Sequence, residues 1–161
     1  MDNTNRDIDA ILEDYEKVKK HESDLNKKKL LGEKQTEENV LQVFKKIIVP
    51  KLNFLKGKID KKGHACNIIE NLESMHFQSV EFNFKPLSKV FGHPIDRFPS
   101  HLLLIFSKPN LIQIKKFIKN REGATTHDYE DEVINISFEA IDGASIEKQV
   151  VNFIEMVLKE N

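Results

Sequence analysis

The first residues that could do chemistry are His64 and Cys66, with His76 further along the chain. On an extended strand His64 and Cys66 share a face, because side chains two residues apart point the same way. A zinc site normally takes four ligands in close pairs, and neither a second cysteine nor an H-x₃-H pair follows them. We therefore expect no metal site and no cofactor, and we interpret Cys66 as a small buried thiol beside a loop histidine.

A second group, His93, Arg97 and His101, lies in and around the proline-rich segment 86–100. Such loops often carry function, with histidine as a general base and arginine as a ligand for oxyanions or phosphates. Nothing in the sequence brings Cys66 to these histidines as a nucleophile. The G-x-S-x-G, P-loop and G-x-G-x-x-G motifs are all absent. The sequence therefore favours a non-enzyme, with a small-molecule-binding or enzymatic domain that uses loop 86–101 as the alternative.

Lysine dominates the segment 45–62, where the only acid is Asp60. A basic run of this kind can meet phosphates, which makes nucleic-acid binding a further alternative. The residues in contact would then be Lys45, Lys46, Lys56 and Lys58. The segment has no arginine for bidentate contacts and shows no interleaved exposed aromatic residues. The solvated face of an amphipathic helix explains the run at least as well, so we do not expect a nucleic-acid partner.

The elements that position these residues begin with a helix over residues 7–31. Its apolar residues recur at the i, i+3, i+4, i+7 spacing of one helix face. They are Ile8, Ile11, Leu12, Tyr15, Val18 and Leu25. The row is narrow, as in a coiled-coil seam rather than in a core helix. We therefore predict that residues 1–35 form a helical arm that pairs as a coiled coil, with Gly32 as the C-terminal cap of its helix.

A second helix is predicted from the N-cap residue Thr36, which two glutamates follow, to Gly63. Its apolar face is wider than that of the arm and should contact a sheet. Pro50 lies inside this helix. Because proline removes one helical hydrogen bond and clashes with the preceding turn, we expect a kink near residues 46–49.

The remaining chain has the pattern of an antiparallel sheet. The predicted strands are residues 64–70, 77–85, 101–106, 111–118 and 133–140. Residues 77–85 alternate apolar and polar side chains, as in a sheet with one wet face, and residues 101–106 read as a buried strand. Residues 111–118 also fit a helical stripe, but the short preceding turn favours a hairpin.

The segments between and after these strands complete the fold. Residues 86–100 read as a loop, and residues 120–132 as a polar, mobile segment. The acidic residues Asp128, Glu130, Asp131 and Glu132 lack the order of a calcium loop, so we interpret them as solvated. A last helix, capped by Ser145, runs to residue 159. The predicted class is α+β: two N-terminal helices, a meander of about five strands and a C-terminal helix, with residues 36–161 as one domain.

Composition and charge restrict the class of protein. The chain has 161 residues, of which 39% are hydrophobic and 32% charged, as in a folded domain. Its single cysteine permits no internal disulfide, its first residues lack a secretory pattern, and its apolar runs are too short to cross a bilayer. Residues 121–161 carry a net charge of −7, which argues against a protein wrapped by nucleic acid. We therefore expect a cytoplasmic protein without membrane contact, and we take its Lys- and Asn-rich composition as bacterial.

The functional expectation comes from the arm. An isolated amphipathic helix is marginal in water, so its seam needs a partner surface. The basic first part of the chain and the acidic last part could also complement each other between two copies. We therefore predict a small, non-enzymatic, homodimeric protein-interaction or regulatory module whose partner is a second copy or another protein.

Overall fold

The computed structural model describes residues 8–74, 77–90, 92–127 and 133–161. His76, the acidic residues 128–132 and the side chain of Ile8 lie outside this description. The chain divides into two units, residues 1–38 and 39–161.

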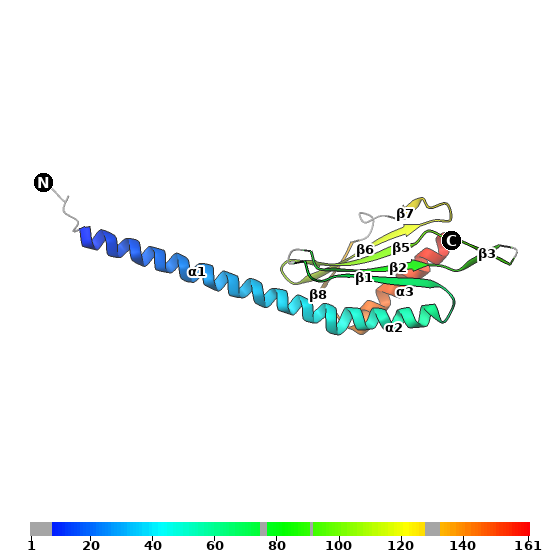
Figure 1. Ribbon diagram of the computed structural model, residues 1–161, viewed down its shortest axis with the longest axis horizontal. Coiled ribbons are helices and arrows are strands. Elements are labelled where there is room, and N and C mark those ends of the chain that lie inside the picture. The colour runs from blue at the N-terminus through cyan, green and yellow to red at the C-terminus, as the bar shows by residue number, and fades with distance from the viewer. Residues whose placement is uncertain (1–7, 75–76, 91, 128–132) are drawn as a thin grey trace. The chain divides into compact units, whose positions relative to one another are not determined.

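The fold is α+β, as the sequence predicts (Figure 1). The helices in the described residues are α1 (Ile8–Val43), α2 (Val49–Asp60) and α3 (Gly143–Glu160), with a π-helix, Phe44–Ile48, between the first two. The strands are β1 (Ala65–Asn71), β2 (Ser79–Lys85), β3 (Ser88–Val90), β4 (His93–Ile95), β5 (Ser100–Ser107), β6 (Leu111–Lys119), β7 (Thr125–His127) and β8 (Val133–Ser137). Residues 111–118, which also fit a helical stripe, are part of strand β6.

Helix α1 continues through Gly32, so the predicted cap at Gly32 and the predicted N-cap at Thr36 are wrong. A glycine inside a helix costs about 1 kcal/mol relative to alanine, which weakens the helix without ending it. The Thr36 hydroxyl donates a hydrogen bond to the carbonyl oxygen of Gly32 at 2.9 Å. Threonine often satisfies its hydroxyl in this way on the carbonyl four residues earlier, and it then lies within a helix.

The predicted irregularity before Pro50 is present as the π-helix Phe44–Ile48. The backbone N–H of Val49 donates to the carbonyl oxygen of Phe44, five residues earlier. Pro50 has no N–H to donate, and its ring crowds the carbonyl one turn before it. The wider π-helical turn fits both conditions, so the boundary between the two N-terminal helices lies here and not at residues 32–36.

The main sheet is antiparallel and, within the described residues, has six strands (Figure 1). Its order is β1-β2-β5-β6, after which the first residues of β6 pair with β8 and its last residues pair with β7. Strands β3 and β4 form a separate two-stranded hairpin. The prediction that residues 86–100 are only a loop is therefore wrong. The hairpin turns at Gly92, whose φ of 80° glycine adopts without a steric cost. The expectation of an irregular segment over residues 120–132 is also wrong at β7, which pairs with the end of β6.

One face of the main sheet carries the core of residues 39–161. Figure 1 shows α2 and α3 on the same side of the sheet. The fully buried hydrophobic residues of this layer are Val80, Phe82, Leu102, Leu104, Ile112, Ile114 and Ile118 from the strands, and Val40, Phe44, Ile48, Leu52, Ile146, Phe153 and Val157 from the helices. Lys116 lies among them at 2% exposure, and its Nζ donates to Asn152 Oδ1 of α3 at 2.6 Å. A buried ammonium needs such partners, because its desolvation is costly.

The other face of the sheet is not covered by these helices. Leu102 and Leu104 of β5 are buried, whereas Leu103 and Ile105 are only partly buried. The prediction that residues 101–106 form a buried strand is therefore right for alternate residues only. The physical reason is the two-residue period of a strand, which sends neighbouring side chains to opposite faces.

Helix α3 begins after Asp142, not at Ser145, which corrects the predicted cap. The backbone N–H of Ser145 donates to the Asp142 carboxylate at 2.7 Å, and the Asp142 N–H donates to Ser145 Oγ at 2.9 Å. The two residues form a capping box. Ser145 therefore takes part in the cap from the third helical position.

Truncation of Phe153 tests the core. Phe153→Ala is expected to lower the free energy of unfolding by about 3–5 kcal/mol, because it removes a fully buried ring that packs edge-on against Phe82. Val151→Ala, on the exposed side of α3, is the matched control and should cost less than about 1 kcal/mol. Urea unfolding followed by circular dichroism measures both, and equal losses would contradict the described packing.

Removal of the α3 cap should give a loss of stability that depends on pH. The backbone N–H of Ser145, together with its hydroxyl, lowers the pKa of Asp142 below its ordinary value of 3.8. A lowered pKa in the folded state stabilises the fold above the unfolded pKa, and this contribution is lost as pH falls through the folded value. Asp142→Ala should therefore lower the melting temperature at pH 7, and its difference from the native chain should shrink below about pH 4.

The matched control is Asp142→Asn, since asparagine is also a favoured N-cap but does not titrate in this range. We expect it to retain most of the melting temperature at pH 7. A difference between Asp142→Ala and the native chain that stays constant down to about pH 3, below the ordinary carboxyl pKa, would contradict the assignment.

Candidate functional site

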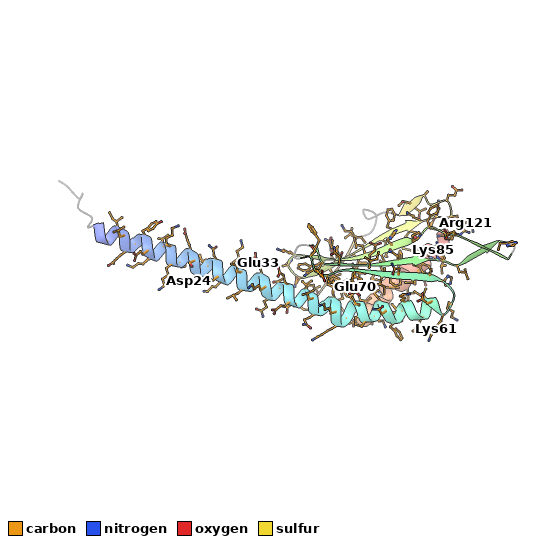
Figure 2. All side chains as sticks on the ribbon, in the orientation of Figure 1. Asp24, Glu33, Lys61, Glu70, Lys85 and Arg121 are labelled. Carbon is orange, nitrogen blue, oxygen red and sulfur yellow. The ribbon has the colours of Figure 1, made fainter. Side chains whose placement is uncertain are left out.

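The apolar seam of α1 is an exposed row of large hydrophobic side chains in the first unit. Ile11, Leu12, Tyr15, Val18 and Leu25 are each between 52% and 60% exposed. Every side chain from residue 10 to residue 35 is exposed. A helix normally buries such a row against another apolar surface, so its exposure makes the seam the candidate site of this unit. Figure 2 shows the side chains projecting all around α1.

Charged side chains flank the seam along α1. Lys17 lies 3.9 Å from Glu13 and 4.0 Å from Asp14, and Lys19 lies 3.3 Å from Glu22. These pairs are exposed and stand three or four residues apart, where each adds only about 0.2–0.5 kcal/mol to the helix. They help to keep α1 helical, but they are too weak to replace the burial of its seam.

His64 and Cys66 lie beside structural contacts. The Leu87 backbone N–H donates to Nδ1 of His64 at 2.8 Å, which uses the ring nitrogen for structure. Burial raises the pKa of the half-buried Cys66 thiol to about 12, with Lys56 acting in the opposite direction. Among the described residues, no group of three or more His, Cys, Asp or Glu side chains could hold a metal ion.

The three predicted ligand-binding residues have different environments. His93 is exposed on β4, whereas Arg97 is buried after that strand. His101 lies on the uncovered face of β5, where its Nδ1 is 2.7 Å from Glu81 Oε1 and 2.5 Å from Asn83 Oδ1. Because both neighbours are acceptor oxygens, Nδ1 carries the hydrogen. The sequence gives no signal for this cluster, since Glu81 and Asn83 reach His101 only through the pairing of β2 with β5.

The lysine-rich helix surface is partly neutralised. Lys56 pairs with Asp60 at 2.6 Å, and Lys51 pairs with Glu147 of α3. Lys45 and Lys46 are exposed, and Lys58 Nζ lies 4.5 Å from the centre of the Phe54 ring. The surface therefore does not have the unbroken positive charge that the sequence of residues 45–62 indicates.

Phe54 is the residue of this surface that sequence reasoning misses. It is 55% exposed, which contradicts the expectation that no exposed aromatic residue stands among the lysines. The sequence does carry a signal for its exposure. Phe44, Ile48 and Leu52 are spaced four residues apart and face the core, and Phe54 does not continue this spacing. A surface groove of about 530 Å³ runs beside it. The groove is lined by Lys46, Ile47, Pro50, Lys51, Phe54, Asp142 and Gly143.

Comparison with known proteins adds no relative. The chain matches no protein-family model, no curated protein and no solved structure. Along the described residues, no helix combines the length and apolar character that spanning a membrane requires.

The reactivity of Cys66 tests its environment. With its pKa raised to about 12 by burial, the native thiol should react with Ellman's reagent at pH 8 at least roughly a hundredfold more slowly than an ordinary exposed thiol. Denaturation in urea should restore the ordinary rate, which serves as the internal control. A native rate equal to the denatured rate would show that the thiol is neither buried nor perturbed.

Proposed function

We propose that this chain is a non-enzymatic protein-interaction module that pairs with a second copy of itself through the apolar seam of α1. The observation that carries the proposal is the row Ile11, Leu12, Tyr15, Val18 and Leu25, which is exposed over its whole length. Large apolar side chains that follow one helix face are typical of an interface, whereas scattered ones are not.

The energetics favour a partner helix over an exposed seam. Full burial of a Val, Leu or Ile side chain stabilises by about 1.5–3 kcal/mol, and exposed helices are only marginally stable in water. Coiled-coil pairing buries such a row by packing each side chain between four residues of the facing helix. A second copy is the simplest partner, since it supplies an identical seam at matched length.

The second unit supports a non-enzymatic reading. Arg97 is buried, His101 is held by Glu81 and Asn83, and the pKa of Cys66 is raised. A nucleophile or base needs an accessible, activated group beside a substrate site. These side chains do not have that arrangement, and their environments are those of structural residues.

Light scattering coupled to size-exclusion chromatography tests self-association. The native chain is expected to have twice the 18.7 kDa mass of one copy at micromolar concentration. Val18→Glu should return it to a monomer, because it places a charge in the buried seam.

The matched control is Leu31→Glu. Leu31 is equally apolar and lies on the same helix at 67% exposure, but it stands outside the seam. This variant should remain dimeric. A native chain that stays at 18.7 kDa, or a Leu31→Glu variant that dissociates as fully as Val18→Glu, would count against the proposal.

A further inference from the structure

The seam of α1 has the register of a heptad repeat. Written as abcdefg, the repeat places Ile8, Tyr15, Glu22 and Lys29 at position a, and Ile11, Val18, Leu25 and Gly32 at position d. The uninterrupted helix through Gly32 and Thr36 allows this register to continue to the end of the first unit. Two charged residues therefore lie in the seam itself, and their partners depend on how two copies are oriented.

We propose that two copies of α1 pair in parallel and in register, an inference that rests on the self-association proposed above. In a parallel pair each seam residue faces its own counterpart. Five layers are then wholly apolar, formed by Ile8, Ile11, Tyr15, Val18 and Leu25. Like charges face each other only at Glu22 and Lys29.

The antiparallel alternatives bury fewer matched apolar pairs. In the alignment that uses residues 8–32 in full, Val18 faces Glu22 and Ile11 faces Lys29, so only Tyr15 and Leu25 form apolar layers. If one antiparallel helix is shifted by one heptad, Ile8 faces Leu25 and Tyr15 faces Val18, so these pairs also become apolar layers. This shift still sets Ile11 against Glu22, and it shortens the interface. Burying a charge against an aliphatic side chain is costly, because that charge gains no partner.

The charges beside the seam favour the same orientation. In a parallel pair, position g of one helix faces position e of the next heptad on the other helix. This brings Asp14 to Lys19 and Lys28 to Glu33, each twice by symmetry. In the full antiparallel alignment Asp14 does meet Lys28, but Lys19 meets its own counterpart. The parallel pair therefore has complementary charges at both flanking positions.

The repulsion between the two Glu22 carboxylates in their layer is reduced by an ion pair within each helix. Lys19 Nζ lies 3.3 Å from Glu22 Oε2, so a cation accompanies each carboxylate. A charged residue at an a position also specifies register at a cost in stability. A shift by one heptad would bring one Glu22 to Lys29 of the other copy, but it would set the second Glu22 against Tyr15 and break the matched Leu25 and Val18 layers. Glu22 and Lys29 thus act as register-setting residues in the proposed pair.

Disulfide trapping in the full-length chain tests the orientation. The native Cys66 is first replaced by alanine, and Leu25→Cys, Tyr15→Cys and Leu31→Cys are then introduced singly. With oxidised glutathione, Leu25→Cys should cross-link to itself in parallel helices, whereas the off-seam control Leu31→Cys should not. An equimolar mixture of Tyr15→Cys and Leu25→Cys chains should give only 15–15 and 25–25 linked peptides by mass spectrometry.

Each outcome decides the question. Mixed peptides that link positions 15 and 25 would overturn the parallel orientation in favour of the full antiparallel pair. A dimer by light scattering without any 25–25 link would overturn the in-register pairing. A monomer by light scattering would refute the proposed self-association itself, which distinguishes that failure from a wrong orientation.

Charge reversal gives an independent test. Lys28→Glu should weaken association roughly three- to tenfold, because each dimer then has two contacts in which the new carboxylate at position 28 faces Glu33 of the other copy. Adding Glu33→Lys should restore most of the affinity in a parallel pair. Sedimentation equilibrium at low salt measures both, and a double variant that associates more weakly than Lys28→Glu alone would contradict the proposed contact.

Discussion

The second unit depends on the covering of one face of its sheet. Three neighbouring strands, β2, β5 and β6, present a continuous apolar surface, and α2 and α3 bury it. The π-helix before Pro50 lets the chain pass the proline while Phe44, Ile48 and Leu52 all reach this core. At the other end, the capping box fixes where α3 begins and therefore where Ile146 and Phe153 lie. Lys116 can be buried in this layer because the side-chain oxygen of Asn152 in α3 accepts a hydrogen bond from its ammonium group.

Much of this fold can be predicted from the sequence, because helix and strand periods differ. The alternation of Val80, Phe82 and Phe84 identifies β2, and the row Phe44, Ile48 and Leu52 identifies a helix that faces a sheet. The sequence is less informative where a residue type is found both at the ends of helices and inside them. Gly32 and Thr36 read as caps but lie inside α1, since their local preferences are weaker than continued helical hydrogen bonding.

Other features could not be predicted, because they depend on pairing between distant strands. The position of Lys116 among buried residues follows from the phase of β6 relative to the helices. The contact of His101 with Glu81 and Asn83 follows from the register of β2 and β5.

The seam of α1 is visible in the sequence, since it is a local periodicity. The exposure of Phe54 could have been inferred from the helical period, since Phe54 lies off the row Phe44, Ile48 and Leu52.

The meander has a consequence for how the second unit reaches its native state. Strands β1 and β2, and strands β5 and β6, are joined by short connections, so these pairings close small loops and cost little chain entropy. The contact of α2 with α3 is different, since it brings together residues 49–60 and 143–160. Helix α2 also contacts β1, which follows it directly in the chain, whereas α3 contacts the sheet mainly through β5 and β6. In synthesis from the N-terminus, the hairpins can form early, but the core closes only after α3 has emerged. The contacts that α3 makes with α2 are therefore among the core contacts with the largest sequence separation, which should form last.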